Sequence, residues 1–255
     1  MVIYRLPTGI KGLDDLLGGG LRAGSVCILT GQAMSGRELL AQEYFFRGLR
    51  EEEGVIYVTT KNFTEEIMED MAEMNWVLDT ARGQYVFIDA YSPQSDPTLQ
   101  DSPTIKYVSS VTDFAKLSNV IMTTMSNFNS EGISSQRIAF DSVDALLMFV
   151  SPSATYRFLS YLRAKIKAFK ATAFFLLQPE LHDEKAAKTV MQLADVTIHL
   201  DVDDSRIDVM QLRKPKRTAR YSVTEKGFII ATTDRVVPRT VHKTVRKILR
   251  PQPPP

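Results

Sequence analysis

The chain has 255 residues, of which 44% are hydrophobic and 24% are charged, and its formal net charge is +1. This is an ordinary composition for a soluble protein, and the length is sufficient for one large core with short additions. No apolar stretch approaches the roughly 20 residues that cross a bilayer, and the first residues lack the layout of a signal peptide, so we expect no transmembrane segment and a cytoplasmic location.

Short apolar runs alternate with longer segments of helical periodicity along most of the chain. The expected strands cover 25–30, 55–59, 85–89, 137–141 and 172–177. Runs this apolar are typical of strands that are buried on both faces of a parallel sheet. The single cysteine, Cys27, lies inside the first run and has no partner for an internal disulfide, so we expect a buried side chain in a reducing compartment.

Helices are expected between these strands. Apolar residues recur every three or four positions over 111–128 and 156–169, as on the buried face of a helix. Asn62, followed three positions later by Glu65, predicts a capping box for a helix over 63–74. The repeated strand-helix-strand order predicts an α/β fold with a doubly wound, mainly parallel sheet.

The pattern changes after Leu193. Apolar runs over 196–200, 207–212 and 228–230 with short connections predict antiparallel edge strands, and the stretch 91–103 has the composition of a surface loop. Pro238 suits the start of a short basic amphipathic helix that ends before Pro251. We therefore expect one domain over 1–233, followed by a basic C-terminal helix and a Pro-rich tail over 234–255.

A possible phosphate-binding loop follows the first long strand. Gly31 and Gly36 have the glycine spacing of a Gly-x-x-x-x-Gly-Lys-Ser/Thr loop, and the residues after Gly36 continue as a helix. Such loops hold phosphates through backbone N–H groups and the N-terminus of the following helix. The spacing and the strand-to-helix context together predict a loop of this type at 31–38.

The residues around this loop resemble one protein family. The segment 6–25, LPTGIKGLDDLLGGGLRAGS, resembles the stretch before the Walker A loop of KaiC-like and archaeal RadA-related proteins of the RecA family. The segments 57–60, 137–142 and 193–200 are similar to the second strand, the Walker B strand and a late Ala-Asp strand of that family. The resemblance covers about residues 3 to 232 and implies a RecA-like P-loop core with ATPase ancestry.

The active positions depart from that resemblance. Arg37 stands at the phosphate-binding lysine, Glu38 at the Mg²⁺-binding Ser/Thr, and Met34 at the loop glycine nearest the phosphates. Arginine is no equivalent of lysine here, and a carboxylate at position 38 repels phosphate oxygens. Lys61 replaces the glutamate that the resemblance implies as the water-activating group. We expect no catalytic residue and little or no ATP hydrolysis.

Two interpretations of the altered loop stay open. In one, ATP or ADP still binds weakly; in the other, the Glu38 carboxylate accepts loop N–H bonds at the anion position and locks the loop. Asp141 and Gln178 either retain the family's metal-water and sensor roles or simply cap their strands. No cofactor is required in either case. The candidate nucleotide-binding positions are Gly31, Ser35, Gly36, Arg37, Glu38, Asp141 and Gln178.

No metal site is expected. His182, His199 and His242 are scattered and have no cysteine partner, which excludes the usual zinc spacing. The aspartates over 201–208 lack the glycine and the terminal glutamate of a calcium loop.

The charge of the chain is uneven. From Leu212 to Pro255 there are 12 Lys/Arg against 2 Asp/Glu. These cations either dock on the protein itself or a neighbour, or form a footprint for nucleic acid or an anionic membrane. The candidate contacts to single-stranded nucleic acid are Arg213, Lys214, Lys216, Arg217, Arg220, Arg239, Lys243, Arg246, Lys247 and Arg250.

Three functions are compatible with these features. The first is a non-hydrolysing RecA-fold regulatory or assembly subunit, in recombination, repair or signalling, that forms a homo-oligomer or pairs with a RecA-family paralogue. The second is an active ATPase that tolerates Arg37. The third is a nucleic-acid-binding module, which can coexist with the first.

Overall fold

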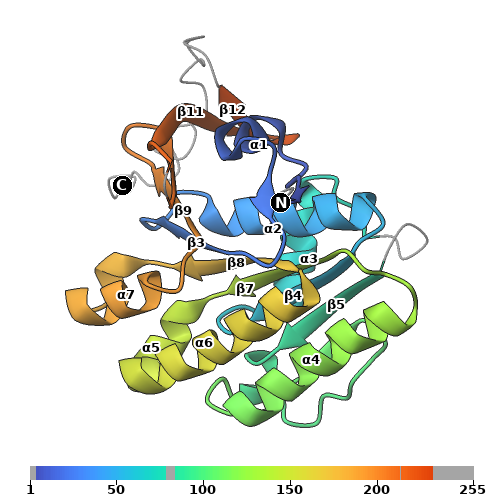
Figure 1. Ribbon diagram of the computed structural model, residues 1–255. Helices are drawn as coiled ribbons and strands as arrows, with labels where there is room; N and C mark the ends of the chain where they lie inside the picture. Colours follow the sequence, from blue (N-terminus) through green and yellow to red (C-terminus); the bar gives the residue numbers. More distant parts are fainter. Residues whose placement is uncertain (1–3, 79–83, 213, 232–255) are drawn as a thin grey trace, which may run out of the picture.

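The computed structural model describes residues 4–78, 84–212 and 214–231. Its main feature is a ten-stranded sheet with the strand order β12-β11-β10-β9-β3-β8-β7-β4-β5-β6 (Figure 1). Strands from β9 to β6 in this order are parallel, and β10, β11 and β12 are antiparallel to their neighbours. The expected α/β architecture with antiparallel edge strands is confirmed.

The bounds of the elements are as follows. The strands are β1 (Arg5–Leu6), β2 (Leu21–Arg22), β3 (Val26–Gly31), β4 (Gly54–Thr59), β5 (Gln84–Asp89), β6 (Ile105–Tyr107), β7 (Gln136–Asp141), β8 (Thr172–Leu177), β9 (Val196–Asp201), β10 (Arg206–Gln211), β11 (Arg217–Thr224) and β12 (Gly227–Ala231). The helices are α1 (Lys11–Leu17), α2 (Arg37–Arg50), α3 (Thr64–Glu73), α4 (Phe114–Ser130), α5 (Val143–Phe149), α6 (Pro152–Phe169) and α7 (Glu184–Met191), with 3₁₀ turns η1 (Ser92–Gln94) and η2 (Pro179–Leu181).

Helices cover both faces of the sheet. The apolar sides of α1, α2 and α3 pack into one core, and those of α4, α5, α6 and α7 pack into a second core on the opposite face (Figure 1). Neighbouring residues of β3 alternate between the two cores: Cys27 and Leu29 face the first, whereas Val26 and Ile28 face the second. Strands buried on both faces explain why these runs are continuously apolar. Within the described residues, no helix is long and apolar enough to cross a membrane.

The antiparallel strands extend the sheet toward the N-terminal helix. Helix α1 lies against β11 and β12 (Figure 1). The approach is very close, because a Cβ at Gly12 would lie 2.2 Å from the carbonyl oxygen of Ile230. Glycine at this position is therefore required for the helix to pack on the strand.

Arg137 attaches the N-terminal segment to the core. Its guanidinium is buried, donates to the carbonyl oxygens of Thr8 (2.6 Å) and Pro7 (2.8 Å), and pairs with Glu53. The Asp14 carboxylate in turn accepts hydrogen bonds from the backbone N–H (2.7 Å) and hydroxyl (2.8 Å) of Thr8. These contacts place the segment that leads into β3.

Most expected elements are found within one or two residues of their predicted ends, but some differ. The predicted capping box is wrong: α3 covers Thr64–Glu73, its N-cap is Phe63, and no side chain caps it. The backbone N–H and hydroxyl of Thr64 instead bond to Asp89, which ends β5. Strand β11 was not expected, since only Ala219 and Tyr221 of its residues are buried and no apolar run marks it. The basic helix, the tail and the boundary at 233 lie outside the described residues.

Candidate functional site

Charged side chains meet at the carboxyl end of the parallel sheet. β3, β8, β7 and β4 are consecutive neighbours, and each ends next to a candidate residue. The loop 31–38 follows β3, Gln178 follows β8, Asp141 ends β7, and Lys61 lies two residues after β4. Ligands of open α/β sheets bind at this edge, so the site occupies the position that the fold favours.

Internal contacts hold the loop 31–38. Tyr221 of β11 donates its hydroxyl to the Ser35 carbonyl (2.8 Å), and the backbone N–H of Val202 meets the side-chain oxygen of Gln32 (3.4 Å). Gly36 is the N-cap of α2 with φ +85°, where a side chain would contact the Phe228 ring. The edge strands therefore brace the loop from the side opposite β8.

Arg37 points into the sheet edge and is fully engaged. Its side chain is 5% exposed. Nη1 donates to the Gly31 carbonyl at 2.6 Å, Nη2 donates to the side-chain oxygen of Gln178 at 3.0 Å, and Nε donates to Glu38 at 3.0 Å. All three guanidinium nitrogens thus have partners within the protein.

Lys61 joins the two carboxylates of the site. Its Nζ lies 2.8 Å from Glu38 Oε1 and 3.2 Å from Asp141 Oδ1. The second carboxylate oxygen of Asp141 accepts a hydrogen bond from the Tyr57 hydroxyl at 3.0 Å. Arg37, Glu38, Lys61 and Asp141 form a continuous network of two cations and two carboxylates, which we call the charge quartet.

The environment of the quartet shifts its pKa values. Burial raises the pKa of Glu38, but attraction to Lys61 and Arg37 outweighs it, and the net pKa is lowered. Burial lowers the pKa of Lys61, but Asp141 and Glu38 outweigh it, and the net pKa is raised. For Asp141, burial and the neighbouring Glu38 charge outweigh Lys61 and Tyr57, and the pKa is raised. The ion pair between Glu38 and Lys61 thus stabilises the charged form of both side chains.

The Glu38 carboxylate has different partners from those expected in the locked-loop interpretation. Its side-chain partners are Arg37 and Lys61, and the backbone N–H that lowers its pKa is its own, in the first turn of α2. The carboxylate does lie at the N-terminus of a helix, where negative charge is favourable. The Glu38 carboxylate is therefore held mainly by side-chain cations.

A second polar cluster adjoins Gln178. The Asp144 carboxylate of α5 accepts a hydrogen bond from the Gln178 backbone N–H (2.9 Å) and lies 2.9 Å from His182 Nε2. Both Asp144 and His182 are almost fully buried. Through Gln178 this cluster is connected to Arg37.

Several basic candidates for nucleic-acid contact bind the protein itself. Arg217 donates to the carbonyls of Asp15 (3.0 Å) and Leu16 (3.2 Å), and Lys214 lies 3.5 Å from the Leu17 carbonyl. These are the last carbonyls of α1, which have no partner within the helix and attract cations. In the same way, Lys216 pairs with Asp208 and Arg220 donates to the Asp204 carbonyl. The remaining candidates, Arg213, Arg239, Lys243, Arg246, Lys247 and Arg250, lie outside the described residues.

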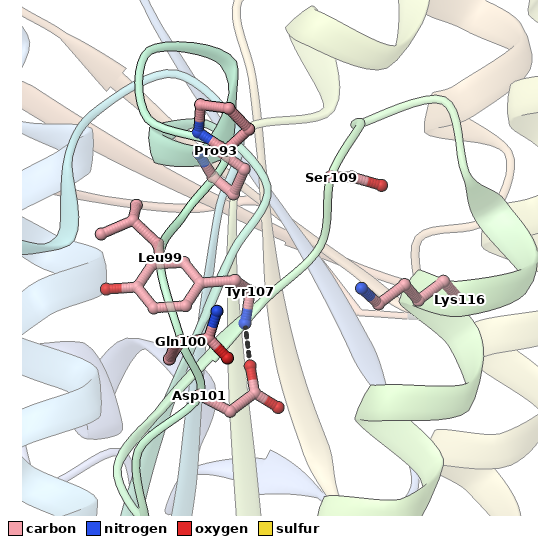
Figure 2. A pocket seen from close by; sticks show the side chains of 8 residues that line it. Pro93, Leu99, Gln100, Asp101, Tyr107, Ser109 and Lys116 are labelled. Carbon is pink, nitrogen blue, oxygen red and sulfur yellow. Dashed lines mark hydrogen bonds between the residues drawn. The ribbon is translucent and has the colours of Figure 1, made fainter.

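A pocket of about 350 Å³ lies at the other edge of the sheet. The loop after β5 forms one wall with Pro93, Pro97 and Leu99, while Tyr107 of β6 and Lys116 of α4 form the others (Figure 2). Partial burial raises the pKa of Tyr107, and the carboxylates of Glu65, Asp89 and Asp101 add to the effect. None of the quartet residues lines this pocket.

Comparison with known proteins identifies the family. The family model described as "ATPase: KaiC" matches residues 6–237, which include the loop 31–38 and all ten strands of the main sheet. The chain belongs to the KaiC ATPase family. The KaiC family model covers nearly the whole length of this chain, as the resemblance implied.

Relatives and solved structures agree with this family. The chain is 25% identical over 241 residues to a UPF0273 protein of Aeropyrum pernix, covering 90% of this chain and 94% of the relative. It is 22% identical to a UPF0273 protein of Thermotoga maritima, covering 90% and 96%. The crystal structure of a KaiC-like protein from Pyrococcus horikoshii matches with a TM-score of 0.66 and 17% identity, over 90% of this chain and 100% of that one. The last match supports the fold.

In this KaiC-family chain, the structure brings several of the candidate residues into contact. The candidates Gly31, Arg37, Glu38, Asp141 and Gln178 do converge. Sequence analysis missed the contact of Lys61 with both carboxylates and the hydrogen bond from Tyr57 to Asp141. The signal that was present is the basic residue two positions after β4, a strand that lies three places from β3 in the sheet.

Proposed function

We propose that this chain is a KaiC-family protein that does not hydrolyse ATP and acts as a nucleotide-independent regulatory or assembly subunit. One observation supports this above the others: the two cations and two carboxylates of the charge quartet neutralise one another. A phosphate-binding loop needs an excess of positive charge and free N–H donors toward the ligand. A quartet with no formal excess charge lacks the first of these.

Arg37 contributes little attraction for phosphate. Its three guanidinium nitrogens already donate to Gly31, Gln178 and Glu38, and the side chain is buried. A phosphate group has to displace at least one of these partners. Hydrogen bonds from a charged group are each worth about 1.5–3 kcal/mol, so the displacement opposes binding.

Glu38 opposes nucleotide directly. A phosphate oxygen at about 5 Å and an effective dielectric near 20 is repelled by roughly 3 kcal/mol, which is about a hundredfold in affinity. The position also lacks the hydroxyl that would hold Mg²⁺ beside the phosphates. The residues present therefore fit a Mg²⁺-nucleotide poorly, and weak ATP or ADP binding is the alternative outcome.

Lys61 cannot activate water. An ammonium group carries three donors and no acceptor, so it cannot take a proton from an attacking water. Its contacts with Glu38 and Asp141 also keep Asp141 in an ion pair inside the protein. This supports a site with a structural role.

Nucleotide titration and phosphate release test the proposal. We expect calorimetry with ATP and ADP, with and without Mg²⁺, to show no saturable binding at concentrations where P-loop ATPases are saturated. Steady-state phosphate release should equal that of an Asp141→Asn preparation, which controls for contaminating enzyme. Release well above this control would show an active ATPase and overturn the proposal.

Exposed apolar side chains support the proposed assembly role. Met148 and Phe149, at the end of α5, are 60% and 66% exposed, and Leu181 of the nearby turn η2 is 51% exposed. Large apolar side chains that are exposed on neighbouring elements are common at contact surfaces. The proposed partner is a second copy or a RecA-family paralogue. Light scattering that shows a strict monomer at high concentration, with no paralogue bound, would contradict self-association or pairing.

Single-stranded nucleic-acid binding is a second proposal, supported by the uneven charge of the chain. Because Lys214, Lys216, Arg217 and Arg220 have partners within the protein, we assign it chiefly to the cations of 232–255. A link to recombination, repair or signalling belongs to the same proposal.

A further inference from the structure

Lys61 is placed as a cation between two oxygen ligands. Its Nζ is flanked by Glu38 Oε1 at 2.8 Å and Asp141 Oδ1 at 3.2 Å, from two different elements. Asp141 Oδ1 is buried and has no hydrogen-bond partner, so the ammonium is its compensating charge. Carboxylate oxygens of this kind are the ligands that hard divalent cations such as Mg²⁺ and Mn²⁺ prefer.

We propose that the Lys61 ammonium is a built-in substitute for a divalent metal ion, and that Glu38 and Asp141 form a masked divalent-cation site beneath it. This inference rests on the proposed function, since it gives the reason why the loop needs no Mg²⁺-nucleotide. Because this cation is covalently part of the chain, the site is filled at every concentration of metal and nucleotide. The loop is then constitutively in one state, as suits a subunit that does not cycle.

The geometry sets what the unmasked site can bind. Two carboxylates with water completing the shell are a usual arrangement for Mg²⁺ and Mn²⁺. Metal–oxygen distances are about 2.1 Å, so the oxygens must move closer than they are to the ammonium. Glu38 is 30% exposed and can move, whereas Asp141 is held by Tyr57. Arg37 also contacts Glu38 and repels a metal, so we expect weak binding, with a Kd of about 10⁻⁴–10⁻³ M.

Removing the amine unmasks the site. Lys61→Ser should bind one Mn²⁺ per chain in nucleotide-free buffer. Binding is measured as the loss of the electron paramagnetic resonance signal of free Mn²⁺. The double variant Lys61→Ser/Glu38→Gln removes one ligand and should bind about tenfold more weakly or not at all. Wild-type protein should show no such site. Lys116→Ser, which removes an exposed lysine from α4, is the matched control and should behave as wild type.

Each outcome is decisive. A folded Lys61→Ser protein without saturable Mn²⁺ binding overturns the inference, as does a Mn²⁺ site in wild type that Glu38→Gln removes. If Lys61→Ser is unfolded without metal, Mn²⁺ should restore its near-ultraviolet circular dichroism, and failure to do so at any Mn²⁺ concentration overturns the inference. Phosphate release is not used here, so a failed metal site and a failed proposed function give different results.

Discussion

Lys61 and Glu38 form a 2.8 Å hydrogen-bonded ion pair although they are 23 positions apart in the sequence. Glu38 lies in the first turn of α2, and Lys61 follows β4. Each departs from the residue that the KaiC-family resemblance implies: Glu38 puts a negative charge in place of a neutral hydroxyl, and Lys61 puts a cation in place of a carboxylate. The two departures are complementary, because one supplies the anion and the other the cation of a single pair.

Replacing Lys61 by Met should destabilise the protein. The substitution keeps the length of the side chain but leaves Glu38 and the buried Asp141 without their shared cation. Breaking a fully buried pair costs about 3–5 kcal/mol, and partial exposure here lowers the expected loss to about 2 kcal/mol. Urea denaturation measures it. Lys61→Arg keeps the charge and should recover most of the loss; equal stability of Lys61→Met and wild type would contradict the prediction.

The stability contribution of Glu38 should depend on pH. Its pKa is lowered in the folded protein, so its contribution is present above the unfolded carboxyl pKa of about 4.3 and is lost as the pH falls through the lowered folded value. The difference in free energy of unfolding between wild type and Glu38→Gln should therefore be constant near neutral pH and shrink in acid. Denaturant titrations at a series of pH values measure this difference. A difference that grows in acid would have the wrong sign.

Repairing one position should not restore ATP hydrolysis. Arg37→Lys alone leaves Glu38 repelling phosphate, and Lys61→Glu alone leaves no bound nucleotide to attack. Because the parts of such a site act together, we expect Met34→Gly, Arg37→Lys, Glu38→Thr and Lys61→Glu to be needed in combination. Phosphate release from the four single variants and the combined variant tests this. Turnover in any single variant would show that the positions act independently.

Arg217→Ala should weaken the attachment of α1. The guanidinium donates to the carbonyls of Asp15 and Leu16 in the last turn of the helix, where Asp15 also accepts a hydrogen bond from the Gly18 N–H. We expect a loss of about 1 kcal/mol in the free energy of unfolding. Arg220→Ala is the matched control on the same strand; its carbonyl partner, Asp204, lies in an exposed turn, so its loss should be smaller. Equal effects of the two variants would argue against capping.

Deleting 237–255 should abolish weak binding to single-stranded DNA. Phosphate neutralisation by Lys and Arg makes such binding fall steeply with salt, and the described cations of 214–220 are paired internally. Fluorescence anisotropy with a labelled oligonucleotide at low salt measures the affinity of both proteins. Unchanged affinity after the deletion would move the binding elsewhere, and no detectable affinity of the full chain would refute the proposal.

The location of the site could be predicted from the sequence because it depends on local patterns. The two glycines, the apolar run before them and the polar residue at the end of each core strand mark the carboxyl edge of a parallel sheet. The contact of Lys61 with Asp141 could not be predicted in this way. It requires β4 to pair with β7, so that Thr59 lies opposite Asp141, and that neighbour relationship joins segments about eighty residues apart.

The hydrogen-bond partner of Glu38 could not be predicted from the sequence either. Whether its carboxylate meets loop N–H groups or a lysine depends on its side-chain rotamer and on the path of the chain after β4. Strand β11 was missed for another reason: exposed Thr218 and Arg220 alternate with buried Ala219 and Tyr221, and the alternation is too short and too polar to stand out. Its role as a brace for the loop became visible only through the Tyr221 hydroxyl.

The clasp made by Arg137 implies an order of assembly during translation. The carbonyl of Thr8 accepts a hydrogen bond from Arg137, which is synthesised 129 residues later. Arg137 also contacts Tyr44 and Glu53, which precede it in the chain. Until β7 has left the ribosome, the segment before β3 lacks its attachment to Arg137, and β3 itself has neither of its neighbours, β8 and β9. During synthesis from the N-terminus, the loop 31–38 is therefore made early, whereas the strands that surround it, β7, β8 and β9, are made later. The charge quartet closes only after β7 has supplied Asp141, so this nascent chain completes its phosphate-loop region as one of its later folding events.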